Sequence, residues 1–442
     1  MKVLFISNDF AGASLCRRLA DEGNQVQAVV AQASCRSILD GVVGKAASLA
    51  EGLAWAGRDS LIVVDEHGFG VLQDELRAAG HAVVGGCAGA DRMEEDRPYC
   101  QDLLKDHGIP ALATHHFPTV IAAIAFLTEQ RGRWVLKQNG YPDKSLCYAG
   151  RLESAEDLLD LLRGFAARGH ADSHIILQQR ADGVEIGVAR YFNGRDWLGP
   201  VEMNIEHKKL FPGDLGPNTC EMGTLMWFDE ADGNRLFNEV LAPLAPHLRA
   251  IGFHGDIDVN CIVNDHGAWP LEVTPRFGYP ATQCQMELFT SNWTDFLLAL
   301  AQGKEFDPPW RRGYALAALA ALPPFPYRAD NFPAWMSPQG LKVRFRNTPP
   351  PEELRHYHFE EARLLASGDW ELCCDSGYAL HVSAFAASVE VARDKLNERL
   401  ANLAVPRLFY RDDLGESFIR EGQTRLRQWG YWRKKTLPLG LP

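Results

Sequence analysis

The sequence lacks several features that would assign it to a class at once. It has no Cys-x-x-Cys pair, so neither a zinc ribbon nor a dithiol redox centre is expected. Its apolar runs, such as residues 120–127, are far too short to cross a bilayer. It also has no internal repeat and no low-complexity segment, which disfavours solenoid and fibrous architectures.

An excess of positive charge is missing as well. Acidic residues outnumber basic ones by 57 to 45, which gives a formal net charge of −12 at pH 7. Proteins that bind nucleic acids in general usually carry basic faces, so this class is disfavoured. A small anion such as ATP needs only a few local cations and is still compatible with this charge. The length of 442 residues and a hydrophobic content of 46% predict a globular protein with several domains.

The ten cysteines are scattered, except for the adjacent pair Cys373 and Cys374. Scattered, mostly apolar-flanked cysteines are typical of reduced core residues in a cytoplasmic protein. The chain turns polar by Asn8, which favours a first strand over a signal peptide. We therefore expect a cytoplasmic protein with no membrane contact. The adjacent pair is expected to be structural, with a redox or metal role as the alternative.

Residues 1–95 alternate between strand-like and helix-like patterns. Strands are predicted at 3–6, 25–30, 60–64 and 81–84, and helices at 11–22 and 69–79. This order predicts an α/β domain with a doubly wound parallel sheet. Residues 8–12 form its first strand-to-helix turn, where such sheets bind ligands. Because the turn is not Gly-x-Gly-x-x-Gly, no dinucleotide is assigned.

Downstream, a central α+β region is predicted over 96–305, with a lid subdomain at about 130–180. Prolines at 308–309 and within 323–326 predict a connector over 306–334, followed by a small C-terminal α/β domain over 335–425. Residues 426–442 form a basic, aromatic tail. Such a tail usually packs its aromatic side chains on the protein surface, although stacking on nucleic acid is the alternative.

A predicted β-hairpin gathers oxygen ligands. Asp256, Asp258 and Asn260 alternate along one strand and therefore share one face, and a turn leads to a second strand that carries Glu272. A magnesium ion bound to ATP phosphates needs one or two protein oxygens, and phosphates and water complete its shell. The alternative is a hairpin with a solvated acidic face.

Two further segments suit a nucleotide. Lys137 ends a buried strand and precedes a Gly-containing loop with a second cation, Lys144, which suits a polyphosphate. Gln178 and Glu185 lie seven residues apart around a turn, a spacing that suits an adenine and its ribose. Both pairs could instead be ordinary surface or structural residues. The polar loop at 206–219 is too rich in ionisable groups for a linker, which indicates a functional role.

At these residues the chain resembles the ATP-grasp ligases, and within them the glycinamide ribonucleotide synthetases (phosphoribosylamine–glycine ligases). The resemblance covers about residues 1–420. It rests on three motifs in order, which are His207-Lys208-Lys209…Gly213-Asp214-x-Gly216-Pro217-Asn218-Thr219…Met222-Gly223, Glu272…Arg276-Phe277-Gly278, and Tyr410-Arg411-Asp412-Asp413-Leu414-Gly415.

The resemblance implies roles for single residues. Lys137 is expected on the α- and β-phosphates, with Lys144 from the lid loop and Arg97 in the position of an ATP-contacting lysine. Gln178 is expected on the adenine, Glu185 on the ribose, and Asn218 at the nucleotide site. The expected ligands of Mg²⁺ (or Mn²⁺) are Glu272, Asn260 and Asp258. Arg276 is expected to stabilise the transferring phosphoryl group.

The chain also departs from the family pattern. The family's first turn, Gly-Gly-Arg-Glu-His-Ala, is replaced by residues 7–12, Ser-Asn-Asp-Phe-Ala-Gly. The lid loop lacks Gly-Lys-Gly and is one residue shorter, and Cys220-Glu221 replaces two glycines. Thr274 replaces the metal-site asparagine, and Tyr279-Pro280-Ala281 replaces Asp-Pro-Glu. These changes fall mostly on the substrate pockets.

The expected activity is an ATP-dependent, ADP-forming ligation of a carboxylate to an amine through an acyl phosphate. Asp214, or His207 through water, could accept the amine proton. The changed pockets favour substrates other than phosphoribosylamine and glycine. The alternatives are the housekeeping purine enzyme and a nucleotide-binding protein without turnover. Expected partners are the small-molecule acid and amine, and the chain is expected to be a monomer or a homodimer.

Overall fold

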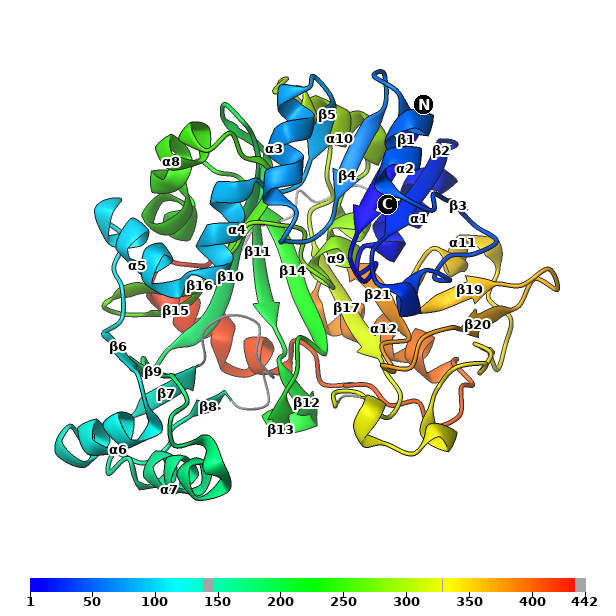
Figure 1. The fold of residues 1–442 in the computed structure, drawn as a ribbon. Helices are drawn as coiled ribbons and strands as arrows, with labels where there is room; N and C mark the ends of the chain where they lie inside the picture. Colours follow the sequence, from blue (N-terminus) through cyan, green and yellow to red (C-terminus); the bar gives the residue numbers. More distant parts are fainter. Residues whose placement is uncertain (138–146, 328, 434–442) are drawn as a thin grey trace.

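The computed structural model describes residues 1–137, 147–327 and 329–433. The three larger sheets of the described residues are a parallel sheet, a long antiparallel sheet and a small projecting sheet (Figure 1), and two short two-stranded sheets accompany them. Among the described residues, no helix has both the length and the apolar character needed to span a membrane.

The N-terminal sheet is parallel, as the sequence predicts. Its strand order is β3-β2-β1-β4-β5, and every neighbouring pair is parallel. The central strands β1 and β4 are buried apolar runs, as expected where helices cover both faces of a sheet. The elements are β1 (Lys2–Ser7), α1 (Ala13–Asp21), β2 (Gln25–Val30), β3 (Gly44–Lys45), α2 (Leu49–Ala56), β4 (Leu61–Val64), α3 (Gly70–Ala78) and β5 (Ala82–Val84).

An eight-stranded sheet runs through the middle of the molecule in the order β16-β15-β10-β11-β14-β17-β21-β18. Its neighbouring strands are antiparallel. The strands are β10 (Val184–Asn193), β11 (Trp197–Glu206), β14 (Gly223–Asp229), β15 (His254–Asn264), β16 (Gly267–Thr274), β17 (Tyr314–Ala320), β18 (Tyr357–Phe359) and β21 (Leu380–Ala386). Helices α9 (Ala281–Leu288) and α10 (Trp293–Ala301) pack on this sheet, and α10 also packs against β4 and β5 of the N-terminal sheet (Figure 1).

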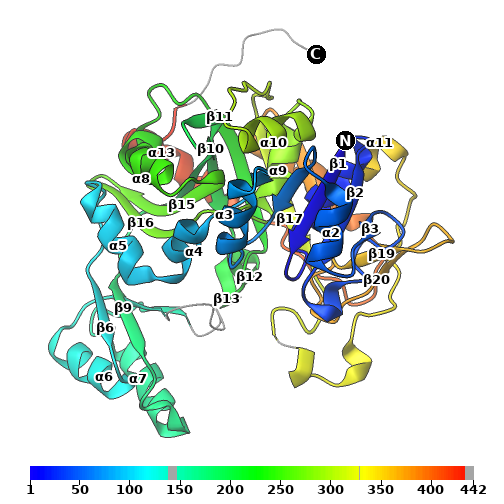
Figure 2. The ribbon, with the colours of Figure 1, turned by 45° about the horizontal axis from the view of Figure 1, so that its top comes forward.

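A small sheet projects from this body (Figure 2). Its order is β6-β9-β7-β8, with β6 (Thr114–Phe117), β7 (Trp134–Lys137), β8 (Tyr148–Ala149) and β9 (Ile175–Gln179). Two helices, α6 (Val120–Glu129) and α7 (Glu156–Phe165), cover it and enclose a separate apolar cluster that includes Leu136, Leu158 and Leu177. This unit begins at β6, before the segment of about 130–180 that was predicted as a lid, and the lid role stays a prediction. Helices α4 (Ala88–Glu95) and α5 (Arg97–Asp106) connect it to the N-terminal sheet.

The segment predicted as a proline-rich connector contains a core strand. Strand β17 lies between the prolines at 308–309 and those at 323–326, and six of its seven residues are buried. It joins β14 to β21, so the C-terminal segment extends the central sheet. The flanking prolines hid this strand, because its own residues, mostly alanine, carry a weak β signal. The division into domains therefore stays a proposal.

The C-terminal segment adds α11 (Pro351–Leu354), β19 (Ala362–Leu364), β20 (Trp370–Leu372), α12 (Val389–Ala401) and α13 (Gln423–Gln428). In the described part of the tail, Tyr431 and Trp432 are buried against the central core. The Tyr431 hydroxyl donates to Glu239 at 2.7 Å, and Arg427 lies over the Trp432 ring. The aromatic side chains therefore pack inward, the arrangement that the sequence favoured over stacking on nucleic acid.

Candidate active site

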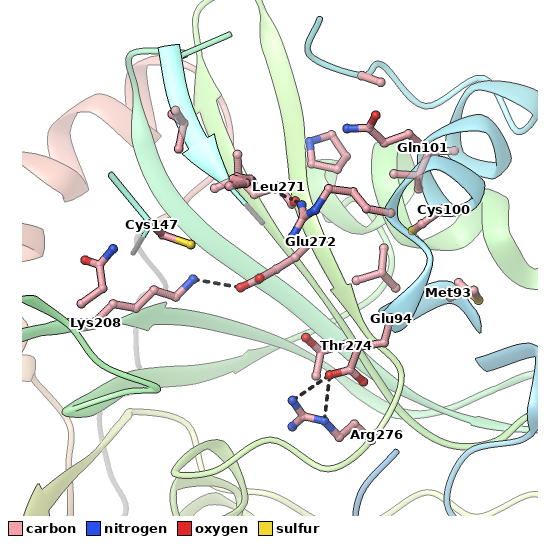
Figure 3. Close-up of a pocket in the computed structure, with 18 of the residues that line it drawn as sticks. Met93, Glu94, Cys100, Gln101, Cys147, Lys208, Leu271, Glu272, Thr274 and Arg276 are labelled. Atoms are coloured by element: carbon pink, nitrogen blue, oxygen red, sulfur yellow. Dashed lines mark hydrogen bonds and ion pairs between the residues drawn. The ribbon is translucent and has the colours of Figure 1, made fainter. Parts of the chain in front are cut away.

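A cavity of about 260 Å³ lies between α4–α5, the lid strand β7 and the hairpin β15–β16 (Figure 3). The loop that follows the short hairpin of β12 (Lys209–Phe211) and β13 (Leu215–Asn218) closes one side. Five of the residues predicted from the sequence line this cavity, together with one that the sequence reading did not assign. They are Arg97, Lys137, Asn218, Glu272 and Arg276, and the unassigned Lys208.

Two cations meet at one wall of the cavity. Lys137 Nζ donates to the Leu271 carbonyl at 3.4 Å, and Arg97 Nη1 donates to the same oxygen at 3.1 Å. Burial, and next the positive charge of Arg97, lower the pKa of Lys137 to about 7. A bound polyphosphate would offset both the burial of the Lys137 ammonium and its repulsion from Arg97, because it supplies the negative charge that this wall lacks.

This pKa predicts a pH dependence of nucleotide binding. The Lys137 ammonium is charged below about pH 7 in the free protein and loses its proton above it, so ATP affinity should fall as pH rises. If only the charged form binds, the Kd for ATP should rise by about fivefold between pH 7 and pH 8. Calorimetric titration across pH 6–9 measures this. Lys137→Arg should flatten the profile, and an equally steep profile in that variant would contradict the assignment.

Three carboxylates surround Lys208, which occupies the centre of the predicted metal site. Lys208 Nζ lies 3.1 Å from Glu185, 2.9 Å from Glu206 and 3.0 Å from Glu272 (Figure 3 draws the pair with Glu272). Burial alone would lower the pKa of Lys208, but these carboxylates raise it well above its usual value. The sequence alone assigned no role to Lys208 or Glu206, although both stand in the loop at 206–219, whose many ionisable groups indicated a function.

The predicted metal ligands lie together on the hairpin. Glu272 and Asn260 face each other across β15 and β16, and Asp258 faces Thr274 two residues along. The Asn260 amide donates to Glu185 at 2.8 Å and to Glu206 at 3.1 Å. Its Oδ1 atom is buried and accepts no hydrogen bond within the described ranges. A hard oxygen ligand without a partner beside Glu272 fits a magnesium-like cation.

Outside the masked residues, no group of three or more His, Cys, Asp or Glu side chains is arranged to hold a metal alone. Asp258 is less available, because its Oδ2 accepts from Asn204 at 2.7 Å. Asn204 reaches it across Gly187 of β10, where a Cβ would overlap the Asn204 amide.

Arg276 lies where β16 leads into α9, and Glu94 of α4 holds it. Its Nε and Nη2 atoms donate to Glu94 Oε1 at 3.1 and 2.9 Å (Figure 3). The ion pair is largely buried, with side-chain exposures of 20% for Arg276 and 10% for Glu94. The guanidinium is therefore fixed beside the cavity, as a group that stabilises a transferring phosphoryl would be. Glu94 carried no recognisable sequence signal.

His207 and Asp214 do not line the cavity. His207 is buried, its Nδ1 lies 3.3 Å from the Gly223 carbonyl, and its Nε2 accepts from the Gly415 amide at 3.1 Å. Burial, and next the charge of Arg411, lower the pKa of His207 to about 4. Asp214 pairs with Arg411 at 2.9 Å. Their predicted role as proton acceptors stays a prediction, and the visible contacts of both residues are structural.

The ion pairs of Arg411 are expected to stabilise the loop that carries Asp214. It is 1% exposed, binds Asp413 through two nitrogens and also reaches Asp214 and the Lys209 carbonyl. Arg411→Met would leave the Asp413 carboxylate without its counter-charge and should lower the free energy of unfolding by about 3–5 kcal/mol. Asp214→Asn should cost about 1 kcal/mol or less, because that side chain is 62% exposed. Urea denaturation measures both, and similar small losses would contradict this account.

The structure describes only some of the other residues that were predicted to contact the nucleotide. Gln178 is buried on β9, and its amide donates to Thr114 Oγ1 at 3.2 Å. Its Oε1 atom has no hydrogen-bond partner in the described part of the chain. Glu185 opens β10 next to Lys208, as described above. Lys144 lies outside the described residues. The roles on adenine, ribose and phosphate stay predictions.

Comparison with known proteins bears on this arrangement. A family model described as "Phosphoribosylglycinamide synthetase, ATP-grasp (A) domain" matches residues 95–282. The phosphoribosylamine–glycine ligase of Xanthomonas axonopodis pv. citri (strain 306) is 28% identical over 454 residues, covering 96% of this chain and 100% of that protein. The Vibrio cholerae enzyme of the same name is 30% identical over 261 residues, covering 55% of this chain and 60% of its own.

The chain is an ATP-grasp ligase. It is of the ADP-forming kind that makes C–N bonds, and its sequence relatives include the phosphoribosylamine–glycine ligases.

Solved structures agree with the fold of the ligase. The crystal structure of phosphoribosylamine–glycine ligase from Thermotoga maritima has a TM-score of 0.69 at 18% identity and covers 93% of this chain and 100% of that one. Biotin carboxylase from Campylobacter jejuni, in complex with an ATP analogue, has a TM-score of 0.62 at 13% identity. It covers 95% of both chains. At these identities the similarity concerns the fold alone.

Proposed function

We propose that the ligase activates a carboxylate with ATP and joins it to an amine, with Mg²⁺ (or Mn²⁺) held by Glu272 and Asn260. The observation that carries this is the convergence of Lys137, Arg97, Arg276 and Glu272 around one cavity, with Asn260 opposite Glu272 on the neighbouring strand. A divalent ion held there would offset the negative charge of the phosphates. The acyl phosphate is a mixed anhydride, so the amine displaces phosphate without a covalent enzyme intermediate.

The chain's own residues would perform distinct parts of this reaction. Lys137 and Arg97 bind the phosphates, and Arg276 stabilises the charge on the transferring group. The lid unit that carries Lys137 would exclude water, since an acyl phosphate otherwise hydrolyses. Gln178 and Glu185 would hold the adenosine. Asn218, at the rim of the cavity, would contact the nucleotide from the loop.

The substrate pair is the finer part of the proposal. The name of the relatives gives phosphoribosylamine and glycine, and their similarity extends over nearly the whole of both chains. The comparisons therefore favour this pair over the different substrates that the altered motifs led us to expect. One observation still favours a different amine, and it concerns the turn after β1, described below.

The test is ADP release by the purified ligase with Mg·ATP. Glycine and phosphoribosylamine, generated in situ, are compared with a matrix of amino acids and amines, and Glu272→Gln serves as the blank. Turnover with any acid–amine pair supports the ligase proposal, and the preferred pair names the substrates. Binding of ATP without ADP release across the whole matrix would count against it and favour a binding protein.

A further inference from the structure

In the turn after β1, the backbone N–H groups donate hydrogen bonds to the chain's own side chains. Residues 8–12 lie at the carboxyl ends of β1 and β4, the ligand-binding edge of a doubly wound sheet. Backbone N–H groups in such a turn can bind an anion. Here the N–H groups of Asn8 and Asp9 donate to Glu66 Oε1, and that of Gly12 donates to Asp65 Oδ2 at 2.7 Å.

The other two donors of the turn are also used. The Phe10 N–H donates to Ser7 Oγ at 2.8 Å, and the Ala11 N–H donates to Asp9 Oδ1 at 3.0 Å. Ser7 Oγ in turn lies 3.0 Å from both Asp65 Oδ2 and Glu66 Oε1 and can donate its one proton to either. A phosphate arriving at this turn would therefore have to displace carboxylates from every backbone donor except one.

The charges at this turn also disfavour a bound phosphate. Burial raises the pKa of Asp65 and of Glu66, and their acidic neighbours raise both further. Their anionic forms therefore lack a sufficient counter-charge. The cation beneath the turn, Lys45, lies over the Phe10 ring, and Asp40 already holds its ammonium at 3.1 Å. A second anion here would be repelled, whereas a cation would offset the cost.

Two buried polar atoms beside Gly12 of this turn have no hydrogen-bond partner among the described residues. Asp65 is fully buried, yet its Oδ1 accepts no hydrogen bond from any described residue, and the Tyr279 hydroxyl is likewise unpaired. Both side chains crowd Gly12, where a Cβ would lie 2.5 Å from the Tyr279 hydroxyl and 2.7 Å from Asp65 Oδ2. Tyr279 lies three residues after Arg276, between β16 and α9, and is close enough to feel the charge of Arg276, which opposes the rise of the Tyr279 pKa caused by burial.

We infer that this turn selects the amine substrate by charge, accepting an ammonium-bearing, unphosphorylated amine and excluding a phosphorylated one. Asp65 and Glu66 are the specificity-determining residues, and the Tyr279 hydroxyl is a further contact. The inference rests on the proposed ligase function, since it names the class of amine. It predicts that this chain does not use an amine whose phosphate would lie at this turn.

Binding measurements test the inference without turnover. The probes are 1,4-diaminobutane and ribose 5-phosphate, each titrated by calorimetry into the full-length ligase loaded with Mg·ADP. The diamine should bind saturably and ribose 5-phosphate should not. Binding of ribose 5-phosphate in competition with the diamine would overturn the inference, and so would absence of diamine binding.

Variants locate the binding at the turn. Glu66→Gln should weaken diamine binding by about tenfold, because it removes a charge within contact range. Tyr279→Phe, which keeps the ring, should weaken it by a smaller factor. Glu75→Gln, on the exposed side of α3, removes the same charge elsewhere and should leave it unchanged. Equal diamine affinity in all four proteins would overturn the assignment of the site.

A kinetic comparison separates the two proposals. With glycine as the acid, ADP release is measured with phosphoribosylamine and with ribosylamine, both generated in situ. A preference for ribosylamine of about tenfold or more is expected. Equal or better use of phosphoribosylamine would overturn the inference and leave the ligase function standing. Diamine binding at the turn without ADP release from any pair would do the reverse.

Discussion

Lys137→Ala is expected to lower the rate of ADP release by about 10²–10³-fold, the loss typical of removing one group that stabilises a transition state. Lys137 is one of two cations that share the Leu271 carbonyl at the phosphate wall of the cavity. Its low pKa shows that burial and Arg97 already disfavour the charge, so the lysine is poised for an anionic ligand. Steady-state kinetics with saturating Mg·ATP measure the change.

Two controls accompany this variant. Lys137→Arg keeps the charge and should retain more activity than alanine, while losing the geometry of the ammonium. Lys304→Ala removes an exposed lysine in the segment after α10, outside the cavity lining, and should leave the rate unchanged. If Lys137→Ala kept more than about a tenth of the wild-type rate, the phosphate-binding role would be wrong.

Glu272→Gln is the second change with a large expected effect. It keeps the volume of the side chain but removes the strongest predicted metal ligand, so ADP release should again fall by about 10²–10³-fold. Because Lys208 also loses one of its three carboxylate partners, the ammonium should be held less firmly. The diagnostic measurement is the Mg²⁺ dependence, whose midpoint should move to higher concentration.

The control for this variant is Glu305→Gln, an exposed carboxylate in the segment after α10. It should leave both the rate and the Mg²⁺ midpoint unchanged. Unfolding should also be monitored, since a folded Glu272→Gln protein with a normal Mg²⁺ midpoint would show that the metal is held elsewhere. A low rate with an unaltered midpoint would assign Glu272 a positioning role through Lys208.

The regular elements were largely accessible from local patterns. The buried runs of β1 and β4 and the alternation that brings Asp258 and Asn260 to one face are short-range features, and each strand forms where they predict it. The loop around Lys208 was likewise visible from its density of ionisable groups. Strand β17 was not, because an alanine-rich run between prolines becomes a core strand only when β14 and β21 flank it.

The sequence by itself predicted the parallel N-terminal sheet and the alternation that brings polar side chains to one face of a strand, because these features depend on residue types at short spacing. Three motifs that resemble a known family indicated the ATP-grasp class and the residues expected at its site. Only the tertiary structure decided which groups are paired. It joined Glu94 to Arg276, Arg411 to Asp214, and Asp65 and Glu66 to the turn after β1. Such pairings join residues 50 or more positions apart, and their partners are fixed by packing of distant segments, which no local pattern encodes.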